Sequence, residues 1–174
     1  TAGVKRSESS GGKTAALISA LSISGGLEPI ARALSAGEMK VLVSDVRNRG
    51  DAARGEMIYR RAQLLCQSCH AIGGGGGVVG PDLVSVGSSA PVDYIVDSLL
   101  EPAKKIKEGY HTTVVTTKSG NVVTGAVVRE SGSELILRMI DGSERSVVAS
   151  SVSRKEVAPV SMMPPGLTAT LRKD

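Results

Sequence analysis

The chain has 174 residues, which is enough for one domain of ordinary size or for two small ones. Apolar residues make up 41% of the sequence and can fill a core, but only 2% are aromatic, so the large flat side chains that usually dominate a core are almost absent. The net charge of +4 comes without a long Lys/Arg run, and with so few side chains for base stacking we expect no nucleic-acid partner.

The first part of the chain is expected to be mostly helical. Residues 1–12 are rich in Ser, Gly and Lys and are predicted to form a mobile lead-in. From residue 13 to about residue 48, apolar side chains recur at helical spacing, with breaks at Gly25-Gly26 and at Gly37. We therefore assign residues 1–49 to a lead-in followed by two or three short helices.

The next part of the chain is predicted to contain two helices and a loop. A helix over residues 51–65 begins with a capping Asp and runs into a pair of cysteines. Five consecutive glycines, residues 73–77, are predicted to be loop. A second helix is expected over residues 91–100, because Pro91 suits a first turn and Pro102 ends the pattern.

From about residue 110 the pattern becomes that of β-strands. Segments rich in β-branched residues follow one another, separated by Ser-Gly and Asp-Gly pairs that are typical of hairpin turns. We predict a small antiparallel sheet of four or five strands over residues 110–157. Residues 158–174 return to loop, with the start of a helix as an alternative for part of them.

Residues 66–70 carry the strongest chemical signal in the sequence. They are Cys66-Gln67-Ser68-Cys69-His70, the C-x-x-C-H pattern by which c-type haem is attached. Each thiol adds to one vinyl group of the porphyrin, and two intervening residues in a helical turn space the sulfurs to match the two vinyls. The adjacent histidine then lies beneath the iron as its proximal ligand. We predict one covalent haem c, bonded through Cys66 and Cys69, with His70 on the iron.

Two other interpretations of the cysteine pair are weaker. A thioredoxin-like redox pair needs no histidine and occurs in a βαβ setting that this sequence lacks. A zinc site would need more ligands than the motif supplies, and the whole chain has only two Cys and two His.

The second axial ligand is predicted to be a methionine. Met162 and Met163 lie beside two prolines, and a loop stiffened by proline can hold a side chain on the iron at lower entropic cost. We favour Met163, directly before the prolines, with Met162 as the alternative; Met/His ligation raises the reduction potential. His111 is a rival ligand, although an exposed position at the start of a strand is the simpler interpretation.

Pro81 follows the proximal histidine by about a dozen residues. Its carbonyl oxygen is placed to accept a hydrogen bond from Nδ1 of His70, which would fix the ring and increase its basicity as a ligand. A plain turn is the alternative, and the resemblance described next favours the supporting role.

Residues 50–83 resemble the opening of a class I c-type cytochrome. Gly55 and Tyr59 match the glycine and aromatic positions of that fold's first helix, and Met163 matches its distal-ligand loop. The resemblance extends over about residues 50–170 and is stronger to the haem-binding domain of planctomycete and verrucomicrobial type. A class I cytochrome c normally ends with a helix that crosses the first one, and the given sequence stops at Asp174, where such a helix would begin. We expect either that this helix lies beyond the given sequence or that the N-terminal helices cover the same surface.

This resemblance implies an α+β fold, in which a mainly α-helical cytochrome c core carries an inserted small antiparallel β-sheet and extra N-terminal helices. The first part of the core is expected at residues 50–109, the inserted sheet at 110–157, and the Met-ligand loop with the chain end at 158–174. Four side chains are expected to line the haem pocket: Tyr59, Leu83, Ile95 and Leu99.

The same resemblance implies electron transfer by a low-spin haem in a module of a larger exported, periplasmic protein, and no enzymatic activity of its own. The partner would be a redox protein or a fused dehydrogenase domain. A haem-based sensor or a catalytic haem with a displaceable distal ligand is the alternative, and a contact role for the sheet is a third hypothesis. The chain starts at Thr1 without a signal-like apolar run, so we expect a mature product or a fragment. No stretch approaches the length of a membrane span, and the sequence indicates no oligomeric state.

Overall fold

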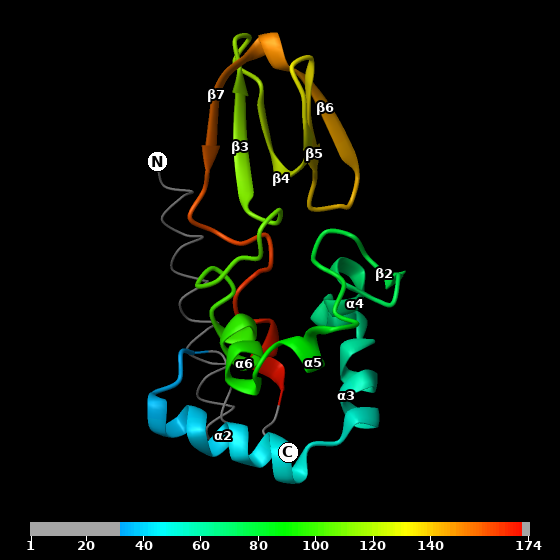
Figure 1. Ribbon diagram of the computed structural model, residues 1–174, viewed down its shortest axis with the longest axis vertical. Helices are drawn as coiled ribbons and strands as arrows, with labels where there is room; N and C mark the ends of the chain where they lie inside the picture. The colour runs from blue at the N-terminus through cyan, green and yellow to red at the C-terminus, as the bar shows by residue number, and fades with distance from the viewer. Residues whose placement is uncertain (1–31, 172–174) are drawn as a thin grey trace, which may run out of the picture.

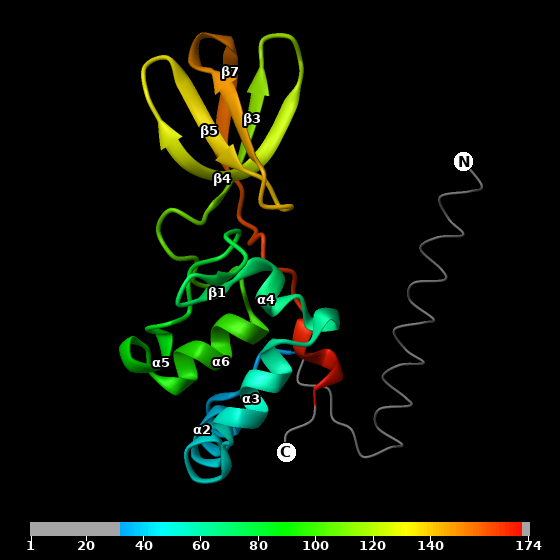
Figure 2. The ribbon, with the colours of Figure 1, turned by 90° about the vertical axis from the view of Figure 1, so that its right-hand side faces the viewer.

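The computed structural model describes residues 32–171. Short helices gather at one end of an elongated molecule, and a five-stranded sheet forms the other end (Figure 1). The view turned by 90° shows that this sheet is curled (Figure 2). The lead-in and the helices expected before residue 32 lie outside the described residues.

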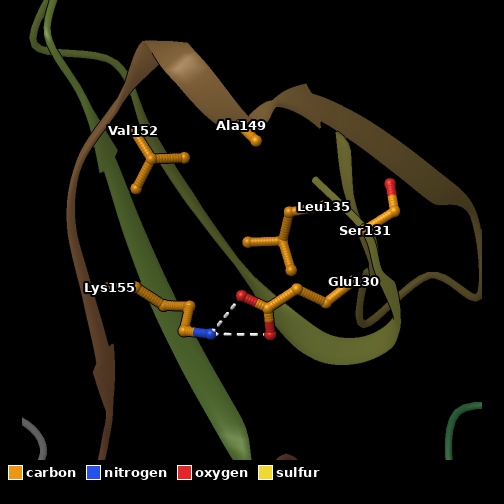
Figure 3. A pocket seen from close by; sticks show the side chains of 6 residues that line it. All are labelled: Glu130, Ser131, Leu135, Ala149, Val152 and Lys155. Carbon is orange, nitrogen blue, oxygen red and sulfur yellow. Dashed lines mark hydrogen bonds and ion pairs between the residues drawn. The ribbon is translucent and has the colours of Figure 1, made fainter. Parts of the chain in front are cut away.

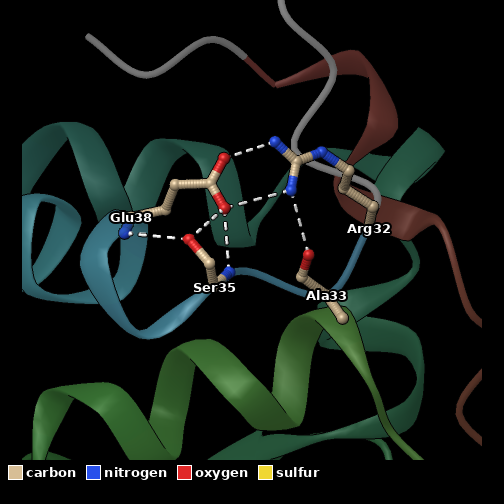
Figure 4. Close-up of polar contacts among 4 residues, drawn as sticks. All are labelled: Arg32, Ala33, Ser35 and Glu38. Atoms are coloured by element: carbon tan, nitrogen blue, oxygen red, sulfur yellow. Dashed lines mark hydrogen bonds and ion pairs between the residues drawn. The ribbon is translucent and has the colours of Figure 1, made fainter.

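Helix α2 (Ala36–Arg49) begins with a capping box. The hydroxyl of Ser35 accepts a hydrogen bond from the backbone N–H of Glu38, and the Glu38 carboxylate accepts one in return from the Ser35 N–H (Figure 4). Arg32 also pairs with Glu38, and these contacts, that of Arg32 first, lower the pKa of this carboxyl to about 2. Local hydrogen bonds thus fix where α2 starts. The helix break predicted at Gly37 is wrong, because Gly37 lies inside the first turn of α2.

Helix α3 (Ala52–Tyr59) begins where the sequence predicts and ends early. The Asp51 carboxylate caps it by accepting a hydrogen bond from the Arg54 N–H at 3.0 Å. The predicted helix over residues 51–65 is therefore wrong in its second half.

The chain breaks between α3 and the cysteine motif. A single 3₁₀ turn, η1 (Ala62–Leu64), is followed by Leu65 in the left-handed region at φ 57°, and then by the one-turn helix α4 (Cys66–Cys69). Leu65 is the one non-glycine residue with positive φ among residues 32–171. The side chain of Leu64 is buried, so tertiary packing overrides the helical propensity of this segment.

Helix α6 (Val92–Leu100) follows the short helix α5 (Val86–Ser89). It begins one residue later than predicted, because Pro91 is its N-cap and not part of its first turn, and it ends at the predicted residue. It contacts α2 and the terminal 3₁₀ helix η3 (Leu167–Thr170). Within the described part of the chain, no helix combines the length and the apolar character needed to cross a membrane.

Five strands lie within residues 110–157, where four or five were expected, and all pair antiparallel in the order β6-β5-β4-β3-β7. Their bounds are β3 Thr112–Thr117, β4 Val122–Glu130, β5 Glu134–Arg138, β6 Glu144–Val148 and β7 Val152–Val157. Gly120 and Gly142 supply the positive φ that two of the hairpin turns need. A 3₁₀ turn, η2 (Ala149–Ser151), lets β7 return beside β3.

One face of the sheet holds the principal hydrophobic core of the described residues. Its members alternate along the strands with more exposed residues, as period-2 packing requires. They are Val115, Val123, Leu135, Leu137 and Val147.

The expected fold class, a mainly α-helical core with a small inserted sheet, is wrong. The structure is richer in sheet: the helices are short, and α2, α3, α4 and α5 contain no fully buried residue. The sheet has five strands and a contiguous core of its own. The physical reason is that the β-branched segments can bury one another locally, whereas the helical segments supply few large apolar side chains.

Truncation in the sheet core should destabilise the protein. Val115→Ala removes two methyl groups from a side chain with 0% exposure, so the free energy of unfolding in urea should fall by about 2 kcal/mol. Val122→Ala, at 59% exposure on the neighbouring strand, is the matched control and should change it little. Equal losses for both variants would contradict the assignment of the core.

Candidate functional site

The cysteine motif occupies one helical turn. In α4 the His70 N–H donates to the Cys66 carbonyl at 2.8 Å, so Cys66 and Cys69 lie three residues apart on the same side of that turn. The two thiols are half-buried and are not joined by a disulfide. Burial raises the pKa of the Cys66 thiol, which therefore stays protonated at neutral pH.

The imidazole of His70 is held from one side. Its Nδ1 lies 2.8 Å from the carbonyl oxygen of Pro81. A carbonyl can only accept, so the proton is on Nδ1 and the lone pair of Nε2 is available to a metal. The hydrogen bond expected between these residues is present; its role in supporting an iron ligand stays a prediction.

Tyr59 connects α3 to the motif. Its hydroxyl donates to the backbone carbonyl of His70 at 2.6 Å. Burial raises the pKa of Tyr59, so the hydroxyl keeps the proton that this hydrogen bond needs. The sequence singled out Tyr59 as a pocket residue and did not reveal this contact.

The glycine loop packs against the backbone of the motif. Two of its members, Gly75–Gly76 (β2), pair with Ala71–Ile72 (β1), so the prediction of loop throughout residues 73–77 is wrong in part. A Cβ built on Gly77 would collide with the Ser68 carbonyl, and one built on Gly80 would collide with the His70 ring. Glycine is required at these two positions because a side chain would push the loop off the motif.

Asp82 holds the start of the same loop. Its carboxylate accepts hydrogen bonds from the backbone N–H groups of Val84 at 2.8 Å, Gly74 at 2.8 Å and Gly73 at 3.1 Å. These bonds, that of Val84 first, lower the pKa of Asp82. The role of Asp82 was not predicted, although an Asp that accepts a hydrogen bond from the N–H two residues further on is typical of an Asx turn.

Arg138 connects the sheet to the loop. Its Nη1 donates to the Val78 carbonyl at 3.2 Å, and its Nη2 pairs with Glu144 at 2.8 Å. A Cβ on Gly142, in the β5–β6 turn, would lie 3.8 Å from a methyl of Val79. No sequence pattern predicts these contacts, because 60 residues separate Arg138 from Val78.

The structure places the remaining candidate residues around the helical end. Leu83 and Ile95 are half-buried, whereas Leu99 is 38% exposed. Met162 and Met163 are half-buried in the segment that descends from β7 to η3 (Figure 1), and η3 contacts α6. No hydrogen bond in the described part of the chain joins either methionine to His70. His111 is half-buried, directly before β3.

The described residues fit a flat apolar group at the motif. Nε2 of His70 has no hydrogen-bond partner among residues 32–171, and both thiols are free. Large apolar side chains are exposed on the segments around the motif: Leu65, Ile72, Val78 and Val84. No cluster of three or more His, Cys, Asp or Glu side chains in the same described range can hold a metal ion. The described residues alone therefore offer no metal centre, but iron in a porphyrin needs only axial ligands from the protein.

A cavity of about 290 Å³ lies elsewhere, in the sheet (Figure 3). Leu135 and Val152 line it, and the ion pair between Lys155 and Glu130 lies at its side. None of the motif residues reaches this cavity, and an exposed ion pair of this kind adds little stability.

Gly80→Ala tests the close contact with His70. The added methyl group must displace the imidazole ring, so the free energy of unfolding should fall by about 1–3 kcal/mol. Gly87→Ala is the matched control, because a Cβ at that helical position meets no atom within 4 Å and should stabilise by up to about 1 kcal/mol. If the two variants shift stability in the same direction, the contact is not tight.

Tyr59→Phe tests the hydrogen bond to the motif through its pH dependence. The variant should lose about 1 kcal/mol at neutral pH. The folded-state pKa of Tyr59 lies above its usual value of 10.0, so the stability due to its proton is intact below pH 10.0 and is lost as the pH rises through the folded pKa. In urea unfolding, the difference between wild type and variant should therefore shrink in alkali.

Tyr94→Phe is the control for this measurement, since no hydrogen bond of the Tyr94 hydroxyl is seen in the described part of the chain. A constant difference between wild type and Tyr59→Phe at all pH values would show that Tyr59 does not titrate through this bond.

No family model and no curated protein matches this sequence, so the functional interpretation depends on the geometry described above.

Proposed function

We propose that the chain is a monohaem c-type cytochrome that transfers electrons. Cys66 and Cys69 would bond the haem covalently, and His70 would bind its iron. The observation that carries this proposal is the hydrogen bond between Nδ1 of His70 and the Pro81 carbonyl, in a histidine that follows two free cysteines of one helical turn.

The Pro81 bond supports the role of His70 as a ligand. A histidine that donates from Nδ1 presents the lone pair of Nε2, in a fixed ring orientation, to a metal. The partial negative charge of the carbonyl also increases the basicity of the imidazole. Gly80, against the ring, and Tyr59, on the His70 carbonyl, restrict the same residue from two other sides.

Exposed apolar side chains support the presence of a large cofactor. Leu65, Ile72 and Val84 are left in solvent on the segments around the motif, where a porphyrin face or edge would cover them. Haem, when bound, supplies a one-electron couple between its ferrous and ferric forms.

Met163 is proposed as the distal ligand, with Met162 as the alternative. Both side chains are half-buried, and the Met163 N–H donates to the Ser161 hydroxyl at 3.1 Å, which restricts the backbone there. A thioether opposite His70 would favour the ferrous state and raise the reduction potential.

The resemblance to exported class I c-type cytochromes further supports a periplasmic location and a redox protein or fused dehydrogenase domain as partner. With both axial positions filled by the chain, the proposed role is electron transfer and not substrate turnover. Haem-based sensing or catalysis would instead require a distal ligand that leaves the iron.

Visible spectra of natively matured protein test this proposal. The wild type should carry one covalent haem by intact-protein mass spectrometry and show low-spin spectra in both redox states. Met163→Ala should abolish the methionine-to-iron charge-transfer band of the oxidised protein, because the thioether is gone. Met162→Ala is the matched control and should keep the band.

Two outcomes contradict the proposal in different ways. Matured protein without added haem mass would refute haem attachment itself. A high-spin wild-type spectrum with rapid carbon monoxide binding would refute electron transfer through a six-coordinate iron and favour a sensor or a catalytic haem. Loss of the band in Met162→Ala alone would exchange the roles of the two methionines.

A further inference from the structure

Two side-chain polar atoms of the described residues are buried without a hydrogen-bond partner: Oγ1 of Thr112 and Nε of Arg138. Both can donate a hydrogen bond, and Arg138 also carries a permanent positive charge. A buried donor without an acceptor is costly, so two of them in one region indicate an acceptor that the chain itself does not supply.

The strand register places both donors in one row. Thr112 of β3 lies opposite Ala126 of β4, and Ala126 lies opposite Arg138 of β5. Residues directly opposite in an antiparallel sheet point to the same face, so the two donors flank the small Ala126 side chain. Adjacent strands are about 4.8 Å apart, which places the two outer residues of the row roughly 10 Å from each other at the backbone.

This row lies on the face opposite the sheet core. Val115 and Leu137 are core residues, and each is an odd number of positions from Thr112 or Arg138 along its strand, so they point the other way. Thr112 is nevertheless only 4% exposed and Ala126 only 3%. The face is therefore covered at this end of the sheet, although it holds none of the core cluster.

The cover at the Arg138 end is the glycine loop of the candidate haem site. Arg138 donates to the Val78 carbonyl, and Val78 precedes Gly80, which lies against the His70 ring, by two residues. Two residues span at most about 7 Å, so the guanidinium group lies close to the surroundings of the proximal histidine.

We propose that Thr112 and Arg138 bind the propionate carboxylates of the haem. This inference rests on the proposed function. Attachment through two thiols consumes the vinyl groups of the porphyrin and leaves its two propionates as the charged groups that a buried site must pair. A carboxylate can accept from either donor, and a guanidinium group is the donor best matched to it.

The site is built from the sheet and not from the helices. Nη2 of Arg138 pairs with Glu144, and Nη1 donates to the Val78 carbonyl. The guanidinium group is thus held on two sides, and its Nε is left without an acceptor among the described residues. The sheet thereby gains a role in cofactor binding, at the point where the two halves of the molecule meet.

The test measures the reduction potential of natively matured holoprotein from about pH 5 to about pH 9, a range in which an unpaired propionate titrates and a paired one does not. Arg138→Gln should lower the reduction potential. A nearby cation destabilises the ferric haem more than the ferrous haem, so its removal favours the ferric state. The potential should also become pH-dependent. Arg138→Lys keeps the charge and should recover most of the wild-type behaviour.

Thr112→Val is close to isosteric and gives a second, independent result. It should shift the potential in the same direction by a smaller amount and lower the unfolding midpoint of the holoprotein. A hydroxyl with no acceptor would instead leave the potential unchanged and raise or maintain the midpoint, because a buried unpaired group is then removed.

Two controls match these variants in the same sheet. Arg154→Gln removes an exposed arginine from β7, and Thr124→Val removes an exposed hydroxyl from β4. Both should leave the potential and its pH profile as in wild type. If haem is attached and the Arg138 and Thr112 variants behave like these controls, the propionate site is refuted while the cytochrome assignment stands; if wild type carries no haem, the proposed function itself fails.

Discussion

The hydrogen bond from Nδ1 of His70 to the Pro81 carbonyl is the constraint around which this end of the molecule is arranged. This hydrogen bond determines the tautomer of the imidazole and the orientation of its ring, and it leaves Nε2 as the nitrogen without a hydrogen-bond partner in the described part of the chain. Most of the neighbouring contacts keep its two partners in place. Gly80 allows the loop to approach the ring, and the Tyr59 hydroxyl donates to the His70 carbonyl. The carboxylate of Asp82, next to Pro81, accepts hydrogen bonds from three backbone N–H groups.

The two ends of the molecule reach stability by different means. The sheet encloses its own apolar cluster, with Val115 and Leu137 fully buried. The helices bury little against one another and leave apolar side chains exposed around the motif, where the proposed haem would cover them. Arg138 joins the two ends through one backbone carbonyl, so the sheet is in contact with the site and is not a separate appendage.

What the sequence could predict depended on how local the determining contacts are. The cysteine spacing and the bounds of α6 follow from residues a few positions apart, and α6 agrees with its prediction to within one residue. The partner of His70 lies 11 positions along the chain, and the family resemblance favoured the hydrogen bond that the structure has. The early end of α3 and the balance between helix and sheet depend on burial, which periodicity alone does not determine. The contact of Arg138 with Val78 depends on strand register and on packing across 60 residues, so no local pattern contains it.

Leu65 separates the orientation of the cysteines from that of α3. Each residue of an α-helix rotates the chain by about 100°, so in one continuous helix any change of length in α3 would turn both sulfurs to a new direction. The left-handed residue before Cys66 interrupts this rotation, and α4 takes its direction from its own contacts with the glycine loop. A change of length in the first turns of α3, ahead of Tyr59, would therefore not by itself turn the two sulfurs to a new direction.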